Sequence, residues 1–425
     1  MALESTPAIS SEAARPVWAD DVRYFARQPI LGLQGRVHGY ELLFRNSPDA
    51  VTPRAGEMAT QTMLDNAVFF GFERFTNGLP AFVTCTAEAL TGQLVSVLPA
   101  ATTVLVIPST LDPVPKLVDA CVELRRQGFR LFLDDFSSQS QLTPLLDLAD
   151  YIRVDFSRME PAERLELQRM NRAPIARVAK KVDTQEDYRQ ACAEGFRLFQ
   201  GEYFCHPLLL KKRKIPANRL FHFEIVRLLH HDPIDVHQVS KLVMRDAALT
   251  FRLLRIVNSP VYAIKQEVRS IESAIFMVGE DALRRMVSLA VLSELNAEQP
   301  PEILQMALLR ARFCEQAAGL FGLEAAEQYL LGMFSLVPAM LCLPMDEVVR
   351  SLPLRDRIRE ALLGTMNSER SLLTWLEFHE RGDWGPCDAV ISDHDPARRE
   401  LNQKRLILCY AEAVNWAQAA LRSAF

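Results

Sequence analysis

The stretch Phe129-Arg130-Leu131-Phe132-Leu133-Asp134-Asp135-Phe136 joins an apolar run to two adjacent carboxylates. A short apolar run of this kind predicts a buried strand. Burying two carboxylates unpaired is costly, so we expect the pair to bind metal, to accept hydrogen bonds or to lie at the wet end of a barrel. The alternative is that Asp134 caps a turn and Asp135 faces water. Other groups that the chain brings to the pair decide between these interpretations.

Strand-like and helix-like segments alternate on both sides of this stretch. Strands are predicted over residues 22–29, 37–44, 81–85, 103–107, 130–134, 151–155, 174–179 and 197–200. Alternation of this kind implies a parallel sheet, and about eight strands indicate a (β/α) barrel. Polar groups at the carboxyl ends of barrel strands form the reactive site. The residues that meet this condition are Glu41, Asp134, Asp135, Asp155 and Gln200.

Four segments, each in or at the end of a predicted strand, carry the pattern of one family. Residues 40–45 read Tyr-Glu-Leu-Leu-Phe-Arg, an ExLxR pattern; residues 134–137 read Asp-Asp-Phe-Ser; residues 151–155 read Tyr-Ile-Arg-Val-Asp; and residues 199–204 read Phe-Gln-Gly-Glu-Tyr-Phe. In this order they resemble the EAL domain of cyclic-di-GMP phosphodiesterases over about residues 22–208. The resemblance implies a barrel in which carboxylates hold two divalent cations that assist phosphodiester hydrolysis.

The residues that match the family's site are Glu41 at its signature metal ligand, Arg45 at its phosphate-contacting arginine, the pair Asp134 and Asp135, and Gln200. Departures from the family pattern include five other positions of the site. The family's strand asparagine falls on Thr84, a metal-binding glutamate on Val106, the water-positioning lysine on Arg153, an acid on Lys180, and a second glutamate on Asp183.

Two of these departures argue against a metal site. Val106 cannot ligate a hard cation, and Lys180 places a positive charge where the family has an acid, which costs several kcal/mol beside a divalent ion at an effective dielectric of about 20. A lysine or arginine near Asp134 and Asp135 could neutralise them instead. We therefore expect no metal, no cofactor and no hydrolysis, and interpret the ten positions as a vestigial site. Two alternatives remain: a receptor that binds cyclic-di-GMP without hydrolysis, and a weakly active phosphodiesterase.

The sequence after Pro207 has helical spacing throughout. Residues 247–262, with the flanking residues 239–246, 268–275 and 278–284, resemble the signature of HDOD domains, and this resemblance covers about residues 200–395. It implies an all-helical bundle similar to HD phosphohydrolases that have lost their metal ligands. The pairs His231-Asp232 and His394-Asp395 are interpreted as loop and capping residues rather than ligands.

The predicted fold class is α/β plus all-α: an EAL-like (β/α) TIM-type barrel followed by an all-helical HDOD bundle. The predicted division is a disordered N-terminal segment over 1–21, a degenerate EAL-like barrel over 22–208 and an HDOD domain over 209–425. We expect a non-enzymatic adaptor or regulator of bacterial signal transduction that works by protein–protein contact. The expected partners are signalling proteins such as a diguanylate cyclase, a kinase or a response regulator, with cyclic-di-GMP and a second copy of the chain kept open.

Composition sets the remaining limits. The 425 residues carry a net charge of −5, with 49% hydrophobic and 24% charged residues, which is typical of globular domains. The eight cysteines follow no metal-like spacing, which favours reduced thiols in a cytoplasmic protein. No segment reaches the length of a bilayer span, so no membrane partner is expected. The basic run 211–214 is interpreted as a solvated linker, and nucleic acid is not an expected partner.

Overall fold

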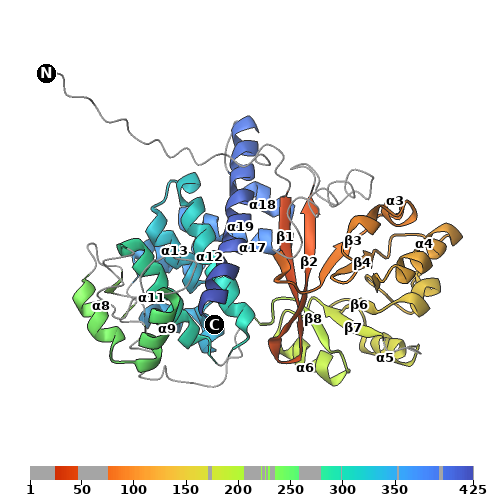
Figure 1. The fold of residues 1–425 in the computed structure, drawn as a ribbon, viewed down its shortest axis with the longest axis horizontal. Helices are drawn as coiled ribbons and strands as arrows, with labels where there is room; N and C mark the ends of the chain where they lie inside the picture. Colours follow the sequence, from red (N-terminus) through yellow and green to blue (C-terminus); the bar gives the residue numbers. More distant parts are fainter. Residues whose placement is uncertain are drawn as a thin grey trace.

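The computed structural model describes the larger part of the chain, namely residues 24–45, 75–170, 175–204, 222, 225, 228–229, 235–257, 279–297, 299–351, 354–391 and 396–424. Within these residues, strands β1 to β8 close into a barrel in chain order, and a bundle of helices follows it (Figure 1). The predicted fold class, a TIM-type barrel followed by a helical bundle, is confirmed. The predicted N-terminal segment 1–21 and the predicted boundary between residues 208 and 209 lie outside the described residues.

The barrel strands match the predicted order. They are β1 (Tyr24–Gly32), β2 (Val37–Arg45), β3 (Ala81–Thr84), β4 (Thr103–Ile107), β5 (Arg130–Leu133), β6 (Tyr151–Asp155), β7 (Ala176–Lys180) and β8 (Leu198–Gln200). Strands β2 to β8 are parallel, but β1 runs antiparallel to both β2 and β8. The expectation of a wholly parallel sheet is therefore wrong for β1. Its link to β2 is only the short η1 (Leu33–Gly35), and so tight a connection can join only antiparallel strands.

Helices connect the parallel strands on the outside of the barrel (Figure 1). They are α3 (Ala87–Thr91), η2 (Leu94–Val97), α4 (Pro115–Arg126), η3 (Thr143–Leu148), α5 (Pro161–Met170) and α6 (Gln185–Ala193). The side chain of Thr184 caps α6 in a reciprocal pair with Asp187, which fixes where the chain turns after β7.

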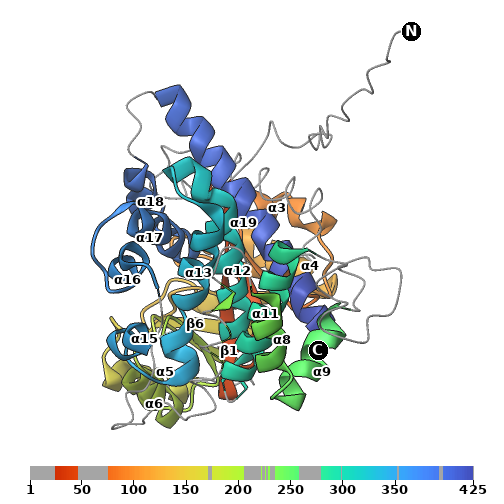
Figure 2. The ribbon, with the colours of Figure 1, turned by 90° about the vertical axis from the view of Figure 1, so that its left-hand side faces the viewer.

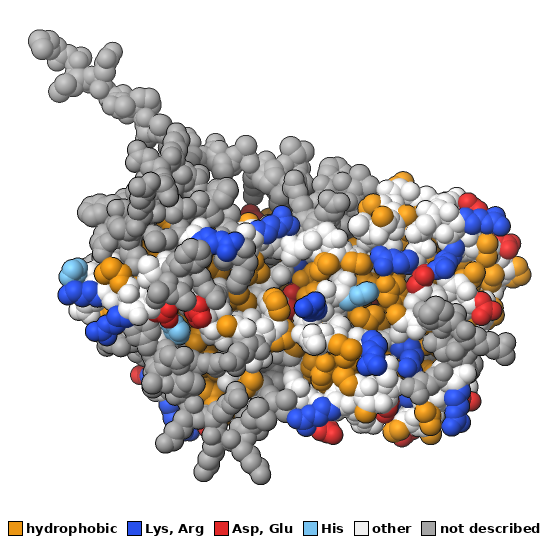
Figure 3. All heavy atoms as spheres, turned by 60° about the horizontal axis from the view of Figure 1, so that its bottom comes forward, with side chains coloured by type: hydrophobic (Ala, Val, Ile, Leu, Met, Phe, Trp, Pro, Cys, Tyr) orange, Lys and Arg blue, Asp and Glu red, His pale blue; other side chains and the backbone are white. Residues whose placement is uncertain are grey.

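The barrel interior is a packed core of inward-facing side chains. Its buried members are Ile30, Phe82, Val104, Val106, Phe132, Tyr151, Val178 and Leu198. Near the amino ends of the strands, His38 Nε2 lies 3.1 Å from the Tyr151 hydroxyl, to which Arg130 Nη1 also donates. In Figure 3, which brings the bottom of Figure 1 forward, Lys and Arg side chains lie singly or in small groups among apolar atoms. Apolar side chains therefore fill the barrel interior. The polar residues of the candidate site lie at the carboxyl ends of the strands.

The helical half contains only helices and loops in the residues that the structure describes. They are α8 (Val236–Val243), α9 (Ala247–Val257), α11 (Glu280–Leu295), α12 (Pro301–Ala317), η5 (Ala318–Phe321), α13 (Ala325–Phe334), α14 (Val337–Leu341), α15 (Met345–Ser351), α16 (Asp356–Leu362), α17 (Ser368–Arg381), α18 (Trp384–Val390) and α19 (Pro396–Ala424). No described helix is both long and apolar enough to span a bilayer. The pairs His231-Asp232 and His394-Asp395 and the basic run 211–214 lie outside the described residues.

Helix α12 lies at the centre of the bundle, against α13 and α19 (Figure 2). Its Phe313 stacks on Trp375 of α17 with ring centroids 5.3 Å apart, and both side chains are buried. The burial of this tryptophan makes it a core residue of the bundle. Helices α17 and α19 also contact β1, so the bundle packs directly on the barrel wall (Figure 1).

The barrel and the bundle share a buried polar contact. The Tyr40 hydroxyl of β2 donates to Glu302 Oε2 of α12 at 2.9 Å. The Arg27 guanidinium of β1 lies 4.5 Å from the centre of the Tyr40 ring and donates through Nη1 to the Phe75 carbonyl at 2.7 Å. Burial raises the pKa of Glu302 to about 7, partly offset by the charge of Arg27 and the hydrogen bond from Tyr40. Part of the domain interface therefore depends on a protonatable group.

We expect Glu302→Gln to change how stability depends on pH. Because the folded chain holds the Glu302 proton up to about pH 7 and the unfolded chain only to about 4.5, the free energy of unfolding falls as pH rises through this window. The variant lacks this loss, so its stability relative to the wild type should rise by up to about 3 kcal/mol between pH 4.5 and 8. Urea unfolding at several pH values measures the difference. Glu280→Gln, at an exposed position, is the control, and an equal difference at every pH would contradict the assignment.

Candidate functional site

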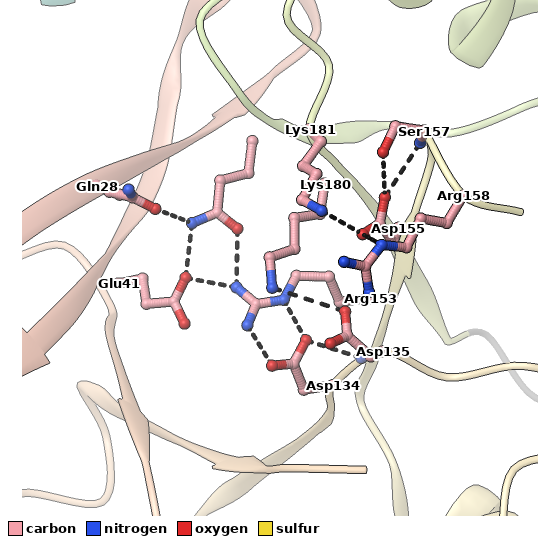
Figure 4. Close-up of polar contacts among 11 residues, drawn as sticks. Gln28, Glu41, Asp134, Asp135, Arg153, Asp155, Ser157, Arg158, Lys180 and Lys181 are labelled. Carbon is pink, nitrogen blue, oxygen red and sulfur yellow. Dashed lines mark hydrogen bonds and ion pairs between the residues drawn. The ribbon is translucent and has the colours of Figure 1, made fainter. Parts of the chain in front are cut away.

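Strand ends of the barrel bring the candidate residues to one place (Figure 4). Glu41 comes from the middle of β2, Asp134 and Asp135 follow β5, Arg153 lies within β6, and Lys180 ends β7. Gln200 ends β8 and joins the same cluster by hydrogen bonds. Parallel strands place their carboxyl ends at one rim of a barrel, which explains the convergence of residues far apart in sequence.

Arg153 is the centre of this cluster, and its side chain is only 2% exposed. Nε and Nη2 donate to the two oxygens of Asp134 at 2.5 and 2.6 Å, a bidentate pair. Nη1 donates to Glu41 Oε2 and, at 2.8 Å, to Gln200 Oε1. The guanidinium also lies 5.2 Å from the centre of the Phe132 ring, whose buried face supports it from the barrel interior. The Arg153 guanidinium thus binds both Glu41 and Asp134.

The electrostatics of the cluster follow from this geometry. Burial alone would raise the pKa of Asp134, but the charge and hydrogen bonds of Arg153, with a further contribution from Lys180, bring this pKa below its usual value. Burial alone would lower the pKa of Arg153, but Glu41 and Asp134 raise it. Asp134 is therefore ionised and Arg153 is charged at neutral pH. The pair is stabilised by complete hydrogen bonding rather than by solvent.

Two lysines neutralise the other carboxylates at the rim. Lys180 Nζ lies 3.6 Å from Asp135 Oδ1, and Lys181 Nζ lies 2.8 Å from Asp155 Oδ2. Asp135 and Lys181 both have positive φ, 43° and 59°, in the left-handed region that side chains other than glycine rarely adopt. Strained backbone of this kind is retained where surrounding contacts hold it, and it occurs often at functional sites. The positive groups expected near the aspartate pair are present, with Arg153 on Asp134 and Lys180 on Asp135.

Thr84, Val106 and Asp183, also in the predicted set, have no described hydrogen bond or ion pair to the cluster. Val106 is buried among the apolar side chains of the barrel interior, and Thr84 is exposed at the end of β3. Asp183 lies in the loop after β7, where Oδ1 accepts from the backbone N–H of Glu202 at 3.0 Å. Arg45 ends β2, and the position of its side chain is outside the described residues. The structure therefore brings together Glu41, Asp134, Asp135, Arg153, Lys180 and Gln200 from the predicted set.

One residue of the cluster was missed by the sequence analysis. Gln28 of β1 lies directly opposite Glu41 in the β1–β2 register, and its Oε1 accepts from Gln200 Nε2 at 2.9 Å. Gln200 Nε2 also donates to Glu41 Oε2 at 2.6 Å. The sequence contains a signal for this residue, the short connection between the first two predicted strands. Such a connection makes a hairpin, and a hairpin places Gln28 across from Glu41. The expectation of parallel strands hid that pairing.

A divalent cation, which the EAL fold implies, does not fit the cluster as it stands. The Arg153 guanidinium occupies the space between Glu41 and Asp134, and Val106 offers no oxygen that could ligate a cation. Among the described residues, no group of three His, Cys, Asp or Glu side chains is arranged to hold a metal ion. A cation could bind both carboxylates only after Arg153 moved away, because like charges at such distances repel strongly.

Comparison with known proteins defines the class to which this fold and site belong. The HDOD domain family matches residues 215–346. The chain is 30% identical over 407 residues to the cyclic di-GMP phosphodiesterase CdgJ of Vibrio cholerae, covering 93% of this chain and 92% of that protein. The chain therefore belongs to the EAL–HDOD family of cyclic-di-GMP signalling proteins. It is also 29% identical over 405 residues to the uncharacterized protein YuxH of Bacillus subtilis, covering 92% of this chain and 97% of that protein.

Solved structures of other proteins are similar to part of this chain. A calcium and cyclic-di-GMP complex of Klebsiella pneumoniae BlrP1 is 22% identical with a TM-score of 0.37, covering 44% of this chain and 56% of that one. The EAL domain of Mycobacterium smegmatis DcpA is 17% identical with a TM-score of 0.35, covering 42% of this chain and 90% of that one.

The comparison with CdgJ contradicts the prediction that this chain is not an enzyme. A relative of this identity, aligned over almost its whole length, is named a phosphodiesterase, and this points to an enzyme. The prediction rested on single substitutions, chiefly Val106 and Lys180. Such substitutions show which ligands a site lacks, but they do not measure whether a chain turns over a substrate.

Arg153→Met tests whether the Arg153 guanidinium stabilises the site and keeps metal ions out of it. The change leaves Glu41 and Asp134 buried without a countercharge, so we expect the free energy of unfolding to fall by about 3 to 5 kcal/mol. Mn²⁺ at millimolar concentration should restore part of this loss in the variant, because the vacated space lies between two carboxylates. Thermal unfolding with and without Mn²⁺ measures both effects.

The matched control for this experiment is Arg158→Met. Arg158 is on the loop after β6, is 80% exposed and makes a long ion pair with Asp155. Its loss should change stability by less than about 1 kcal/mol and should create no response to Mn²⁺. Equal stabilisation of the wild type and Arg153→Met by Mn²⁺ would mean that the guanidinium does not exclude the cation.

Proposed function

We propose that this chain is a regulator in cyclic-di-GMP signalling that acts through protein–protein contacts of its helical half, with the barrel as a sensing or docking scaffold. The observation that carries the proposal is the position of Arg153, bound between Glu41 and Asp134. In this state the strand ends are joined by a hydrogen-bonded ion-pair network, and the bundle packs on the outer wall of the same barrel.

The domain arrangement supports the same proposal. The β1–β2 hairpin that carries Glu41 into the site also carries Tyr40 into the bundle, where its hydroxyl donates to Glu302. The two halves are therefore joined through a buried, hydrogen-bonded surface rather than by a linker alone. A partner that binds the bundle would sense the state of the barrel, and a ligand of the barrel would be felt by the bundle. The partners in question are signalling proteins such as a diguanylate cyclase, a kinase or a response regulator.

Glu41→Gln tests whether the signalling output depends on the barrel carboxylate. Gln keeps the size of Glu41 and an oxygen that accepts from Arg153, so the variant should fold. We expect it to restore the output of a strain that lacks the gene as fully as the wild type does. A fluorescent cyclic-di-GMP reporter in living cells measures the output, and circular dichroism of the purified variant checks its fold. Loss of output in the folded variant would place the function in the barrel site.

Turnover and binding of cyclic-di-GMP are measured on the same preparations, because the name of the Vibrio relative points to hydrolysis. A hydrolysis rate that Glu41→Gln abolishes while the output persists would show that turnover in the barrel is separate from the protein-contact role, and loss of both would contradict the proposal. Calorimetric titration of the wild type with cyclic-di-GMP, with and without Mn²⁺, separates a receptor from a pure protein-contact regulator. Saturable binding without Mn²⁺ would add the nucleotide as a ligand of the barrel.

A further inference from the structure

The side chains of Arg153, Gln200 and Gln28 form a continuous line of hydrogen bonds from the barrel site to the helical half. Arg153 Nη1 donates to Gln200 Oε1 at 2.8 Å, and Gln200 Nε2 donates to Gln28 Oε1 at 2.9 Å. Gln28 Nε2 then donates to the backbone carbonyl of Arg381 at 2.7 Å and to that of Glu380 at 3.3 Å. These two carbonyls are at the C-terminal end of α17. The Gln28 end of this line is part of the network in Figure 4.

The direction of this line is fixed at both ends. A helix C-terminus presents carbonyl oxygens that only accept hydrogen bonds, so Gln28 must turn its NH₂ group toward α17 and its oxygen toward Gln200. Gln200 must then turn its NH₂ group toward Gln28 and Glu41, which leaves its oxygen facing the site. That oxygen needs a positive donor, and Arg153 supplies it. Reversing any one amide would place two acceptors or two donors face to face.

The end of α17 is also held to the same rim by contacts outside this line. Arg381 forms a two-pronged ion pair with Glu202, which lies two residues after Gln200. Gly382 ends the helix with φ of 75°, and a Cβ there would lie 2.6 Å from Leu43 Cδ1 of β2. The last residues of α17 therefore rest on the barrel wall beside the site.

We propose that Gln28 is a positioning residue that couples the occupant of the Glu41–Asp134 site to the end of α17. When a positive group holds the Gln200 oxygen, Gln28 is oriented to bind the helix end. When that group is lost, Gln200 and Gln28 lose their fixed orientation, and the helix end loses a donor for two carbonyls. Hydrogen bonds in a line strengthen one another, so loss at one end is felt at the other. The inference deepens the proposed signalling role by naming how the barrel site is linked to the bundle.

The experiment uses hydrogen exchange of the full-length chain. The reporters are the backbone amides of Gly382 and Asp383, which bond to the carbonyls of His379 and Phe378 and exchange when the α17 end opens. In Arg153→Lys the single ammonium cannot reach Asp134, Glu41 and Gln200 together, so we expect the reporters to exchange about fivefold faster. In a Gln28→Glu background the same change should add nothing, because Glu has no NH₂ group to pass the effect on.

Two further variants separate the line from ordinary packing. Gln141 donates in the same way to two carbonyls at the barrel rim, those of Ser109 and Leu111, but does not join this line. Gln141→Leu should leave the effect of Arg153→Lys on the reporters unchanged. Glu202→Gln should speed exchange by weakening the separate clamp, with the effect of Arg153→Lys still present on top of it.

The proposal is overturned if the effects of Arg153→Lys and Gln28→Glu on hydrogen exchange are additive. If Arg153→Lys speeds the reporters equally with Gln28 and with Glu at this position, or does not speed them at all, the line does not couple the two halves. These outcomes are read on purified protein without a partner, so they are independent of the reporter assay in cells. The proposed signalling role can therefore fail while the coupling stands, and the reverse also holds.

Discussion

The arrangement of the barrel mouth depends on one buried group of three charged side chains, in which Arg153 binds both Asp134 and Glu41. Removing three charged side chains from water costs several kcal/mol for each ion, and only full hydrogen bonding offsets that cost. Arg153 achieves this with four donor contacts, two to Asp134, one to Glu41 and one to Gln200. The ammonium of a lysine has a single nitrogen and no planar fork, so it could not bridge the two carboxylates and the amide at once. The difference between lysine and arginine at this position therefore changes what the site holds.

The strand order and the strand ends were predictable because they are local properties. Alternating apolar strands and helices follow from side-chain periodicity, and seven of the strands run as that pattern implies. The direction of β1 was not predictable from periodicity, which is the same for parallel and antiparallel strands. It follows from the short connection at Leu33–Gly35, and this is a property of the turn rather than of the strand.

The site was predictable as a set of residue types but not as a set of contacts. The sequence places positive side chains near Asp134 and Asp135, and three of them do neutralise carboxylates. Which lysine or arginine meets which aspartate depends on how far each side chain reaches across the rim. Arg153 lies two residues before the end of β6, and its length lets it extend to the rim and cross to β2. Lys180, at a strand end, meets the exposed Asp135 instead.

The prediction that the chain is not an enzyme was wrong for a related reason. Missing ligands describe only the residues of one site, whereas the relationship to CdgJ covers almost the whole chain.

The alternation of side chains along β2 explains why the site and the domain interface are linked. Neighbouring residues of a strand point to opposite faces of the sheet. Glu41 therefore faces the barrel mouth, while Tyr40 faces outward to α12 and binds Glu302. On the antiparallel partner β1, Gln28 and Arg27 repeat the division, with Gln28 toward the site and Arg27 stacked on Tyr40. One two-stranded wall thus carries the polar groups of both surfaces. A shift of this wall by one residue in register would exchange the two sets of side chains, so neither surface can change its register without the other.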